Sequence, residues 1–174
     1  CTGVFRIGRL PKRCWYGKGH GHLTVAEAIQ VSCNVFFYQL GLQIGDTLIN
    51  RYAAMTGLKG PTGIDLPSEA GGFMSGEKRY NELHRSRGWK WTDGLQCDHA
   101  IGQTQNFTPL QLAVMVSTLA NGGKQMRPHV LKEVRTHGGV VVYQQAHEIV
   151  SEMDVDSGVQ AEIRSAMQRV VEPG

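Results

Sequence analysis

The apolar positions in the first third of the chain have the spacing of helices. They recur through residues 28–42, directly after residues 24–27, Thr-Val-Ala-Glu, which have the sequence of a capping box. Ser32 and Asn34 interrupt this stretch with side chains that compete for backbone hydrogen bonds. We therefore predict two helices that meet near Ser32, the second of which ends at Gly45 in a left-handed conformation.

Three later stretches also predict helices. Residues 47–56 follow a capping residue, Asp46, and stop at Gly57. Residues 108–120 open with Thr-Pro-Leu-Gln, which combines an N-cap, a proline at the first helical position and a capping box. Residues 157–171 carry apolar side chains on one side only, as an amphipathic surface helix does.

The remaining stretches predict little regular structure apart from one hairpin. Residues 1–21 are rich in glycine and basic residues and have no period, so we expect a loop with, at most, one short strand. Glycine and proline recur through residues 59–98, which we expect to form a long irregular connection. Residues 130–135 and 140–143 flank a His-Gly-Gly turn and predict a β-hairpin. The predicted fold class is α+β, mainly α.

The length and composition are those of about one globular domain. The chain has 174 residues, of which 41% are hydrophobic. Its longest strongly apolar stretch, residues 31–42, is broken by polar residues and is shorter than the about 20 residues that a membrane span needs. The chain begins at Cys1 without an initiator methionine and stops at Gly174 just after a predicted helix. We expect a segment of a longer protein, with no transmembrane segment of its own.

The charge is nearly balanced overall but uneven along the chain. The formal net charge is +3, from 18 basic and 15 acidic residues. Five basic residues precede the first acidic residue: Arg6, Arg9, Lys12, Arg13 and Lys18. Such a basic head attracts anionic partners, but neither a recognition-helix pattern nor an aromatic RNA-binding signature accompanies it. We expect a solvated basic loop and no nucleic-acid partner.

The cysteines and histidines predict neither a disulfide scaffold nor a metal site. The chain has four cysteines, Cys1, Cys14, Cys33 and Cys97, and none of them forms a C-x-x-C pair. His20 and His22 suggest metal ligands, with Cys14 and Cys33 as the nearest partners in the sequence. The spacing differs from that of structural zinc sites, whose ligands come in close pairs on both halves. We therefore predict no bound metal.

The side chains of the segment Ser32-Cys33-Asn34 are the ones in this chain that best suit a chemical reaction. A serine hydroxyl both donates and accepts a hydrogen bond, and an asparagine amide offers a carbonyl and two N–H groups. Together they can relay a proton and hold a peptide bond. The same residues also suit a plain cap at a helix junction, and the segment alone leaves both interpretations open.

The surroundings of this segment resemble the second-motif region of class B penicillin-binding proteins. The resemblance covers residues 19–41 and continues in family order through TGIDLPSE, AIGQ, TPLQLA and LANGG, at residues 62–69, 100–103, 108–113 and 119–123. The Cys-Thr-Gly and Cys-Trp context near the start and the Phe-Phe-Tyr-Gln-Leu run are most similar to the elongation-type, rod-shape enzymes.

The resemblance implies a serine-type peptidoglycan D,D-transpeptidase that is acylated by β-lactams, but it covers only one of the three motifs of that family. The family uses S-x-x-K, S-x-N and K-[TS]-G, and this chain has no K-[TS]-G. Its one S-x-x-K, Ser75 to Lys78, follows S-x-N and lies in a glycine-rich stretch, so we expect no nucleophile there. Residues 1–174 are thus expected to be a partial transpeptidase domain between the first and third motifs, inactive by itself.

The fold implied by the resemblance is the helical subdomain of the penicillin-binding and serine β-lactamase-like fold, with a β-hairpin and an incomplete sheet. Ser32 would pass a proton to the leaving D-Ala amine, and Asn34 would bind the stem-peptide or β-lactam amide. Gly102 and Gln103 match a segment that binds substrate near the cleft, although Thr104 stands where glycine is common. No cofactor is implied.

The resemblance also implies partners and a location. The partners are the peptidoglycan stem peptide, β-lactam antibiotics and the cell-wall elongation machinery, and membrane contact would occur only through an N-terminal anchor outside this chain. The location is the cell envelope, as an extracytoplasmic domain, where Cys1 and Cys14 could form a disulfide. The alternative is a non-catalytic penicillin-binding-like module that binds a cell-wall peptide or a partner protein.

Overall fold

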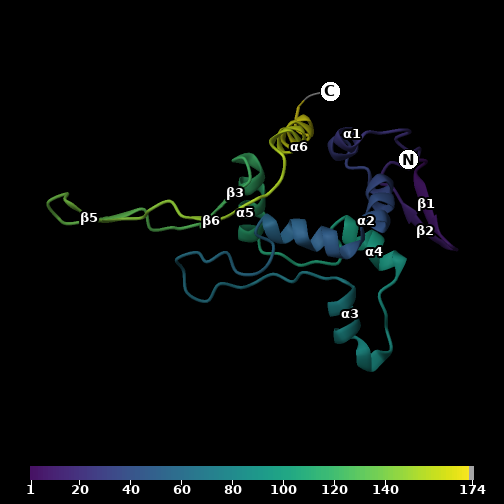
Figure 1. Ribbon diagram of the computed structural model, residues 1–174, viewed down its shortest axis with the longest axis horizontal. Coiled ribbons are helices and arrows are strands. Elements are labelled where there is room, and N and C mark those ends of the chain that lie inside the picture. Colours follow the sequence, from purple (N-terminus) through teal and green to yellow (C-terminus); the bar gives the residue numbers. More distant parts are fainter. Residues whose placement is uncertain (173–174) are drawn as a thin grey trace. The chain divides into compact units, whose positions relative to one another are not determined.

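The computed structural model describes residues 1–172, which form two compact units (Figure 1). The first unit takes in residues 1–52, residues 74–105 and the chain from Asp156 onward, and the second takes in residues 53–73 and 106–155. The described part is mostly helical, and its strands form three separate antiparallel pairs. This agrees with the predicted mainly α, α+β class and with an incomplete sheet.

The first unit starts with a hairpin and two consecutive helices. Strand β1 (Val4–Ile7) pairs with β2 (Leu10–Arg13), so the expectation of at most one short strand was wrong. The reason is the two-residue connection, in which Gly8 takes the positive φ of 55° that a tight hairpin turn requires. Helix α1 (Val25–Gln30) begins at the predicted capping box, in which Thr24 and Glu27 bond each other's backbone N–H groups.

Helix α2 (Asn34–Met55) consists of two helical halves that meet at a kink at Gly45, whose backbone angles are not helical. Gly45 has a φ of 73°, so the prediction that the second helix ends at a residue with positive φ is confirmed. The helix predicted after Asp46 is therefore the second half of α2. The first half buries Val35, Tyr38 and Gly41.

The stretch expected to be irregular, residues 59–98, contains two helices and a 3₁₀ turn. These are α3 (Glu77–Leu83), η1 (Arg85–Arg87) and α4 (Asp93–Ala100). Helix α4 is capped by Thr92, whose hydroxyl accepts a hydrogen bond from the backbone N–H of Leu95 at 3.3 Å. Its buried face includes Gln96 and His99, so the apolar spacing that predicts helices is absent from its sequence.

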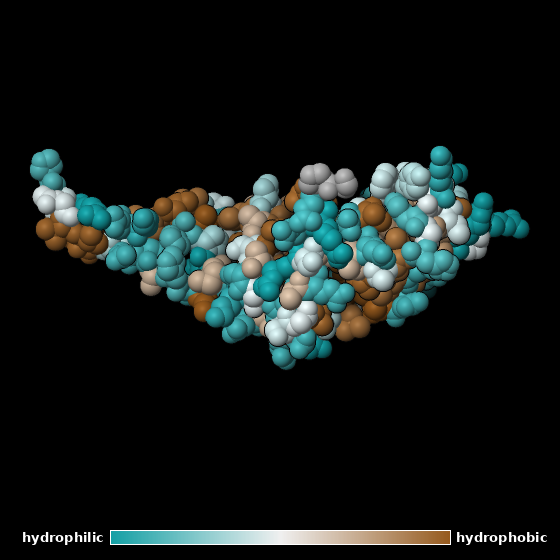
Figure 2. Space-filling model, turned by 90° about the horizontal axis from the view of Figure 1, so that it is seen from above, coloured by the Kyte–Doolittle hydropathy of each residue, from teal (hydrophilic) through white to brown (hydrophobic). Residues whose placement is uncertain are grey.

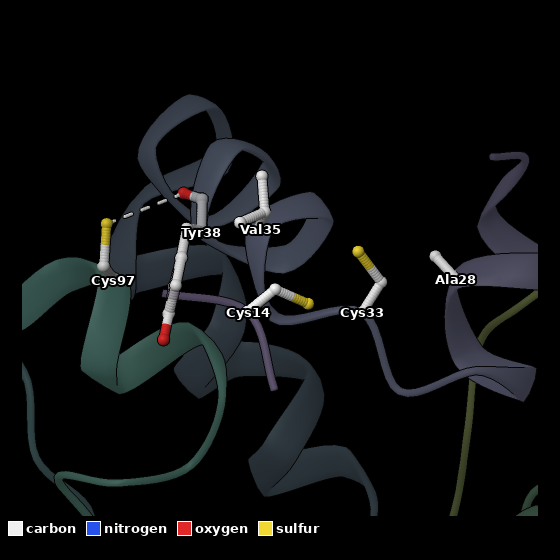
Figure 3. Packing of buried hydrophobic residues seen from close by; sticks show 6 residues of the cluster. All are labelled: Cys14, Ala28, Cys33, Val35, Tyr38 and Cys97. Atoms are coloured by element: carbon white, nitrogen blue, oxygen red, sulfur yellow. Dashed lines mark hydrogen bonds between the residues drawn. The ribbon is translucent and has the colours of Figure 1, made fainter. Parts of the chain in front are cut away.

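A small sulfur-rich core holds the first unit together. Its buried members come from the residue after β2, from α1, from the turn between α1 and α2, from α2 and from α4, and they are drawn in Figure 3: Cys14, Ala28, Cys33, Val35, Tyr38 and Cys97. The thiol of Cys97 on α4 is directed at the backbone carbonyl of Tyr38 on α2. Helix α6 (Ser157–Arg169) closes the unit against α1, and the apolar residues of the two helices line a groove of about 230 Å³.

The second unit is built around α5 (Pro109–Ala120), which begins at the predicted capping box. The strand pair β3 (Lys124–Met126) and β6 (Ile149–Glu152) lies next to it, and the predicted hairpin is present as β4 (Glu133–Arg135) and β5 (Val141–Gln144). The hairpin end carries exposed valines, seen as brown surface at the left of Figure 2. Among the described helices, none is long and apolar enough to cross a membrane.

Candidate functional site

Ser32 occupies a strained turn between α1 and α2. The backbone N–H of Ser32 bonds to Ile29 O at 3.1 Å, and the backbone N–H of Cys33 bonds to Ala28 O at 3.0 Å. This pair of bonds closes α1 in a Schellman motif, whose central residue is left-handed and usually glycine. Ser32 fills that position with a φ of 52°, which a serine adopts only at an energetic cost.

The turn presents the Ser32 hydroxyl to solvent without using it. The side chain is exposed, and within residues 1–172 its Oγ makes no hydrogen bond. The indole N–H of Trp15 instead holds the turn from outside, donating to the carbonyls of Val31 and Ser32, each at 3.0 Å. A helix-junction cap therefore does not account for the hydroxyl, which caps no backbone group.

Asn34 opens α2 one residue beyond a buried cysteine. Cys33 has no exposed surface and points into the sulfur-rich core, so Ser32 and Asn34 lie on the outer side of the segment. Burial raises the pKa of the Tyr38 phenol, and a hydrogen bond with the Asn34 side chain acts in the opposite direction. The S-x-N residues are thus fixed by a packed central residue and by the first turn of a long helix.

A second segment reaches the same place because α4 packs tightly against α2. Gly41 permits the close approach, since a Cβ atom on it would lie 2.2 Å from the Cβ of Ala100. The Gln96 side chain donates to the carbonyl of Gly41 at 2.8 Å. On its other side α4 is tied to β2 by an ion pair between Lys12 and Asp98, with N–O distances of 2.6 and 2.7 Å.

The two segments line an open cavity of about 420 Å³. Its lining residues come from the S-x-N turn, from α2 and from the end of α4: Ser32, Asn34, Phe37, Ala100, Ile101 and Gln103. The structure thus brings three of the predicted site residues together. Gly102 is not a lining residue; its φ of 81° forms the turn that carries Gln103 into the wall.

A group of sulfur and nitrogen atoms lies directly behind this site. The ligand atoms of Cys1, Cys14, His20 and Cys33 all lie within 4.8 Å of one another, and Cys14 Sγ is 3.5 Å from His20 Nδ1. Figure 3 shows the Cys14 and Cys33 side chains directed toward each other. The cysteines are free thiols, so the possible disulfide between Cys1 and Cys14 is not formed.

The donor set of this group fits a zinc ion. Three thiols and one imidazole are the ligands of a Cys₃His structural site. Burial raises the pKa of Cys33, whereas at Cys14 hydrogen bonds from backbone N–H groups outweigh burial and lower the pKa, which favours the thiolate at Cys14. The prediction of no bound metal rested on sequence spacing, which does not register that the fold brings these ligands together from the chain start, the residue after β2, the following loop and the S-x-N turn.

The S-x-x-K match is located away from this cavity's lining. Ser75 is buried just before α3, and Lys78 is exposed on that helix. Neither residue is among those that line the cavity. The Ser75 carbonyl accepts a hydrogen bond from the side-chain amide of Asn50 at 2.8 Å, which gives this residue a structural contact.

The comparison with protein families agrees with these features. Residues 7–174 match the model described as penicillin binding protein transpeptidase domain. The chain belongs to this family. As a penicillin-binding transpeptidase segment it is 32% identical to penicillin-binding protein 2A of Bacillus subtilis over 185 residues, covering 94% of the chain and 24% of that protein. It is 38% identical to peptidoglycan D,D-transpeptidase MrdA of Acinetobacter baumannii over 127 residues, covering 72% of the chain and 18% of that protein.

The solved structures show the same fold. The penicillin-binding protein PBP2 in a complex with MreC from Helicobacter pylori has a TM-score of 0.79 and 24% sequence identity, and the match covers 97% of this chain and 29% of that one. The chain therefore spans between 18% and 29% of the length of these relatives.

Proposed function

We propose that this chain forms part of a serine-type peptidoglycan D,D-transpeptidase of the elongation type, which cross-links cell-wall stem peptides and is acylated by β-lactams. Family membership and the names of the relatives support the reaction class. The observation that carries the proposal is the shared cavity, in which Ser32, Asn34 and Gln103 meet although 69 residues separate Asn34 from Gln103 in the sequence.

The acyl-transfer reaction gives each of these residues a role. The serine of the S-x-x-K motif, which this chain does not supply, would attack the penultimate D-Ala carbonyl after the lysine of that motif has taken its proton. The unpaired Ser32 hydroxyl is free to pass a proton to the leaving D-Ala amine. The Asn34 side-chain amide would bind the peptide or β-lactam amide, and Gln103 would contact the substrate from the other wall.

The partners and the location follow from the same proposal. Its substrate is the stem peptide in the cell envelope, and the protein acts there as an extracytoplasmic domain. Because the Helicobacter relative is seen with MreC, we expect partners from the cell-wall elongation machinery. The proposed chemistry needs no cofactor.

The experiment is labelling with a fluorescent penicillin in the longer protein that contains this chain. We expect a covalent adduct on the wild type, and Ser32→Ala and Asn34→Ala should each lower its rate of formation by at least about tenfold, as loss of a proton-transfer or positioning group does. Ser75→Ala is the matched serine control and should label at the wild-type rate. The 174-residue chain alone should remain unlabelled.

Two outcomes would contradict the proposal. If Ser75→Ala abolishes labelling, the nucleophile is misassigned. If the longer protein is never labelled and a stem-peptide pentapeptide binds to it unchanged, the protein is a binding module and not a transpeptidase.

A further inference from the structure

His99 is a buried ionisable group next to the cavity that the proposed acyl transfer does not use. It lies in the last turn of α4 and is only 1% exposed. The next two residues, Ala100 and Ile101, line the cavity, as does Gln103, but His99 does not. Any effect of His99 on the reaction must therefore act through the cavity-lining residues that follow it in the sequence.

The hydrogen bonds of His99 define one neutral form of the ring. Its Nε2 lies 3.0 Å from Asn50 Oδ1, and its Nδ1 lies 2.8 Å from Gln105 Nε2 and 2.9 Å from Thr104 Oγ1. The amide of Asn50 is oriented by its own bond to Ser75 O, and that of Gln105 by its bond to the carbonyl of His99. An amide oxygen only accepts and an amide nitrogen only donates, so Nε2 carries the proton and Nδ1 accepts.

These bonds connect α2 to the wall of the cavity. Asn50 belongs to the half of α2 that follows the Gly45 kink, and Asn34 opens the half that precedes it. Thr104 and Gln105 end the short loop that starts at the carboxyl end of α4, and two backbone bonds fix the start of that loop, from Gly102 N to His99 O and from Gln103 N to Asp98 O. The imidazole therefore holds the far end of a five-residue segment, with Gln103 in its middle.

We propose that His99 is a positioning residue of the transpeptidase site, whose neutral ring holds residues 101–105 so that Gln103 stays in the cavity with Ser32 and Asn34, and whose protonation releases this wall. The inference rests on the proposed function and concerns a residue that touches no substrate. Thr104, where the family resemblance expects glycine, supplies one of the two donors to the ring.

Protonation has a defined structural effect at this position. A proton on Nδ1 would face the N–H group of Gln105, so the bond from Gln105 to the ring would be lost, whereas the Thr104 hydroxyl would have to turn from donor to acceptor. Within the described residues the Oε1 atom of Gln105 is buried and has no hydrogen-bond partner, so turning this amide would offer the new proton an acceptor. That turn would break the bond from Gln105 to the His99 carbonyl, and it would thereby loosen the loop.

The surroundings keep the ring neutral near neutral pH. Burial lowers the pKa of His99, and the negative charge of Asp46 on α2 opposes this effect only in part. The other side chains against the ring, Trp91, Asn50, Thr104 and Gln105, carry no charge. Because the pKa is lowered, the held state is complete above the ordinary pKa of histidine and is lost as the pH falls through the pKa of the folded protein.

The test is the rate constant of penicillin acylation of the longer protein as a function of pH, together with the amide NMR shifts of residues 101–105. We expect an acid limb in the wild type that His99→Gln removes, since glutamine keeps a donor and an acceptor but does not titrate. At pH 7.5, His99→Ala should lower the rate about tenfold, as a displaced wall does. Thr104→Val should lower it about fivefold, the effect of one neutral hydrogen bond, and Thr104→Ser should restore it.

The controls separate this inference from the function on which it rests. His137→Gln changes an exposed histidine in the other unit and should leave the rate and the pH profile unchanged. If Ser32→Ala slows acylation while His99→Gln and Thr104→Val match the wild type at every pH, the inference is refuted and the function stands. If penicillin does not label the protein, the function fails, and the NMR titration still decides whether protonation of His99 moves the Gln103 amide.

Discussion

The strain at Ser32 predicts that the serine at this position lowers the free energy of unfolding. A left-handed conformation costs an L-residue about 1–2 kcal/mol, and glycine avoids this cost. Ser32 has this conformation, with a φ of 52°, in the position of a Schellman motif that glycine prefers. Replacing it with glycine should therefore stabilise the fold, while replacing it with alanine should leave the strain in place.

The size of the effect follows from three contributions. Ser32→Gly removes about 1–2 kcal/mol of strain but adds about 0.5–1 kcal/mol of backbone entropy to the unfolded chain, so the net gain is about 0.5–1 kcal/mol. Ser32→Ala keeps the strain and removes a hydroxyl that is exposed and unbonded, so the change stays within about 0.5 kcal/mol. The glycine variant should thus exceed the alanine variant by about 1 kcal/mol.

Urea unfolding and thermal melting of the two variants measure this difference. For a chain of 174 residues, 1 kcal/mol corresponds to about 2–4 °C in Tm. Both variants lack the hydroxyl, so penicillin acylation in the longer protein should fall equally in both. If the glycine variant is no more stable than the alanine variant, Ser32 is not held in the left-handed turn, and the strain argument is wrong.

Three further predictions concern the packing of α4 on α2, the turn at Ser32 and the Cys₃His group. Gly41→Ala should destabilise the chain by about 1–3 kcal/mol, because the new methyl group would meet Ala100, whereas Gly17→Ala adds a Cβ with no neighbour within 4 Å and should be neutral in the same urea titration. Trp15→Phe should cost about 1 kcal/mol and slow acylation, since the phenyl ring cannot donate to the carbonyls of the Ser32 turn; equal melting curves and rates would contradict this. Purified chain should contain one zinc ion by elemental analysis, which Cys14→Ser should abolish and Cys97→Ser should leave in place, and a chelator should lower the Tm only where zinc is bound.

The elements that were predictable from the sequence are those whose signals are local. The capping boxes at Thr24 and Thr108 and the left-handed residue at Gly45 depend on a few adjacent side chains, and the structure has all three. Helix α4 was missed because its buried face carries Gln96 and His99, whose burial is permitted by hydrogen bonds to other elements. No local pattern encodes such partners.

The candidate site divides in the same way. Ser32 and Asn34 were named from a motif, and their place at a helix junction followed from the poor helix propensity between the two apolar stretches. The Cys₃His group could not be found from spacing, because its members are brought together by the β1–β2 hairpin and by the turn that follows α1. The one available sign was compositional, since three of the four cysteines precede residue 34 and the loop between them carries two histidines.

The first unit is built from segments that are far apart in the sequence, so its parts are synthesised at different times on the ribosome. Helix α1 emerges at residues 25–30, yet its partner α6 begins only at residue 157. At a synthesis rate of about 5–20 residues per second, the apolar side of α1 stays exposed for about 6–25 s before α6 begins to emerge. During that interval α4 can already dock on α2, so the cavity is formed before the unit is closed. A nascent chain held at this stage would present Val25 and Ile29 to any chaperone that binds short apolar segments.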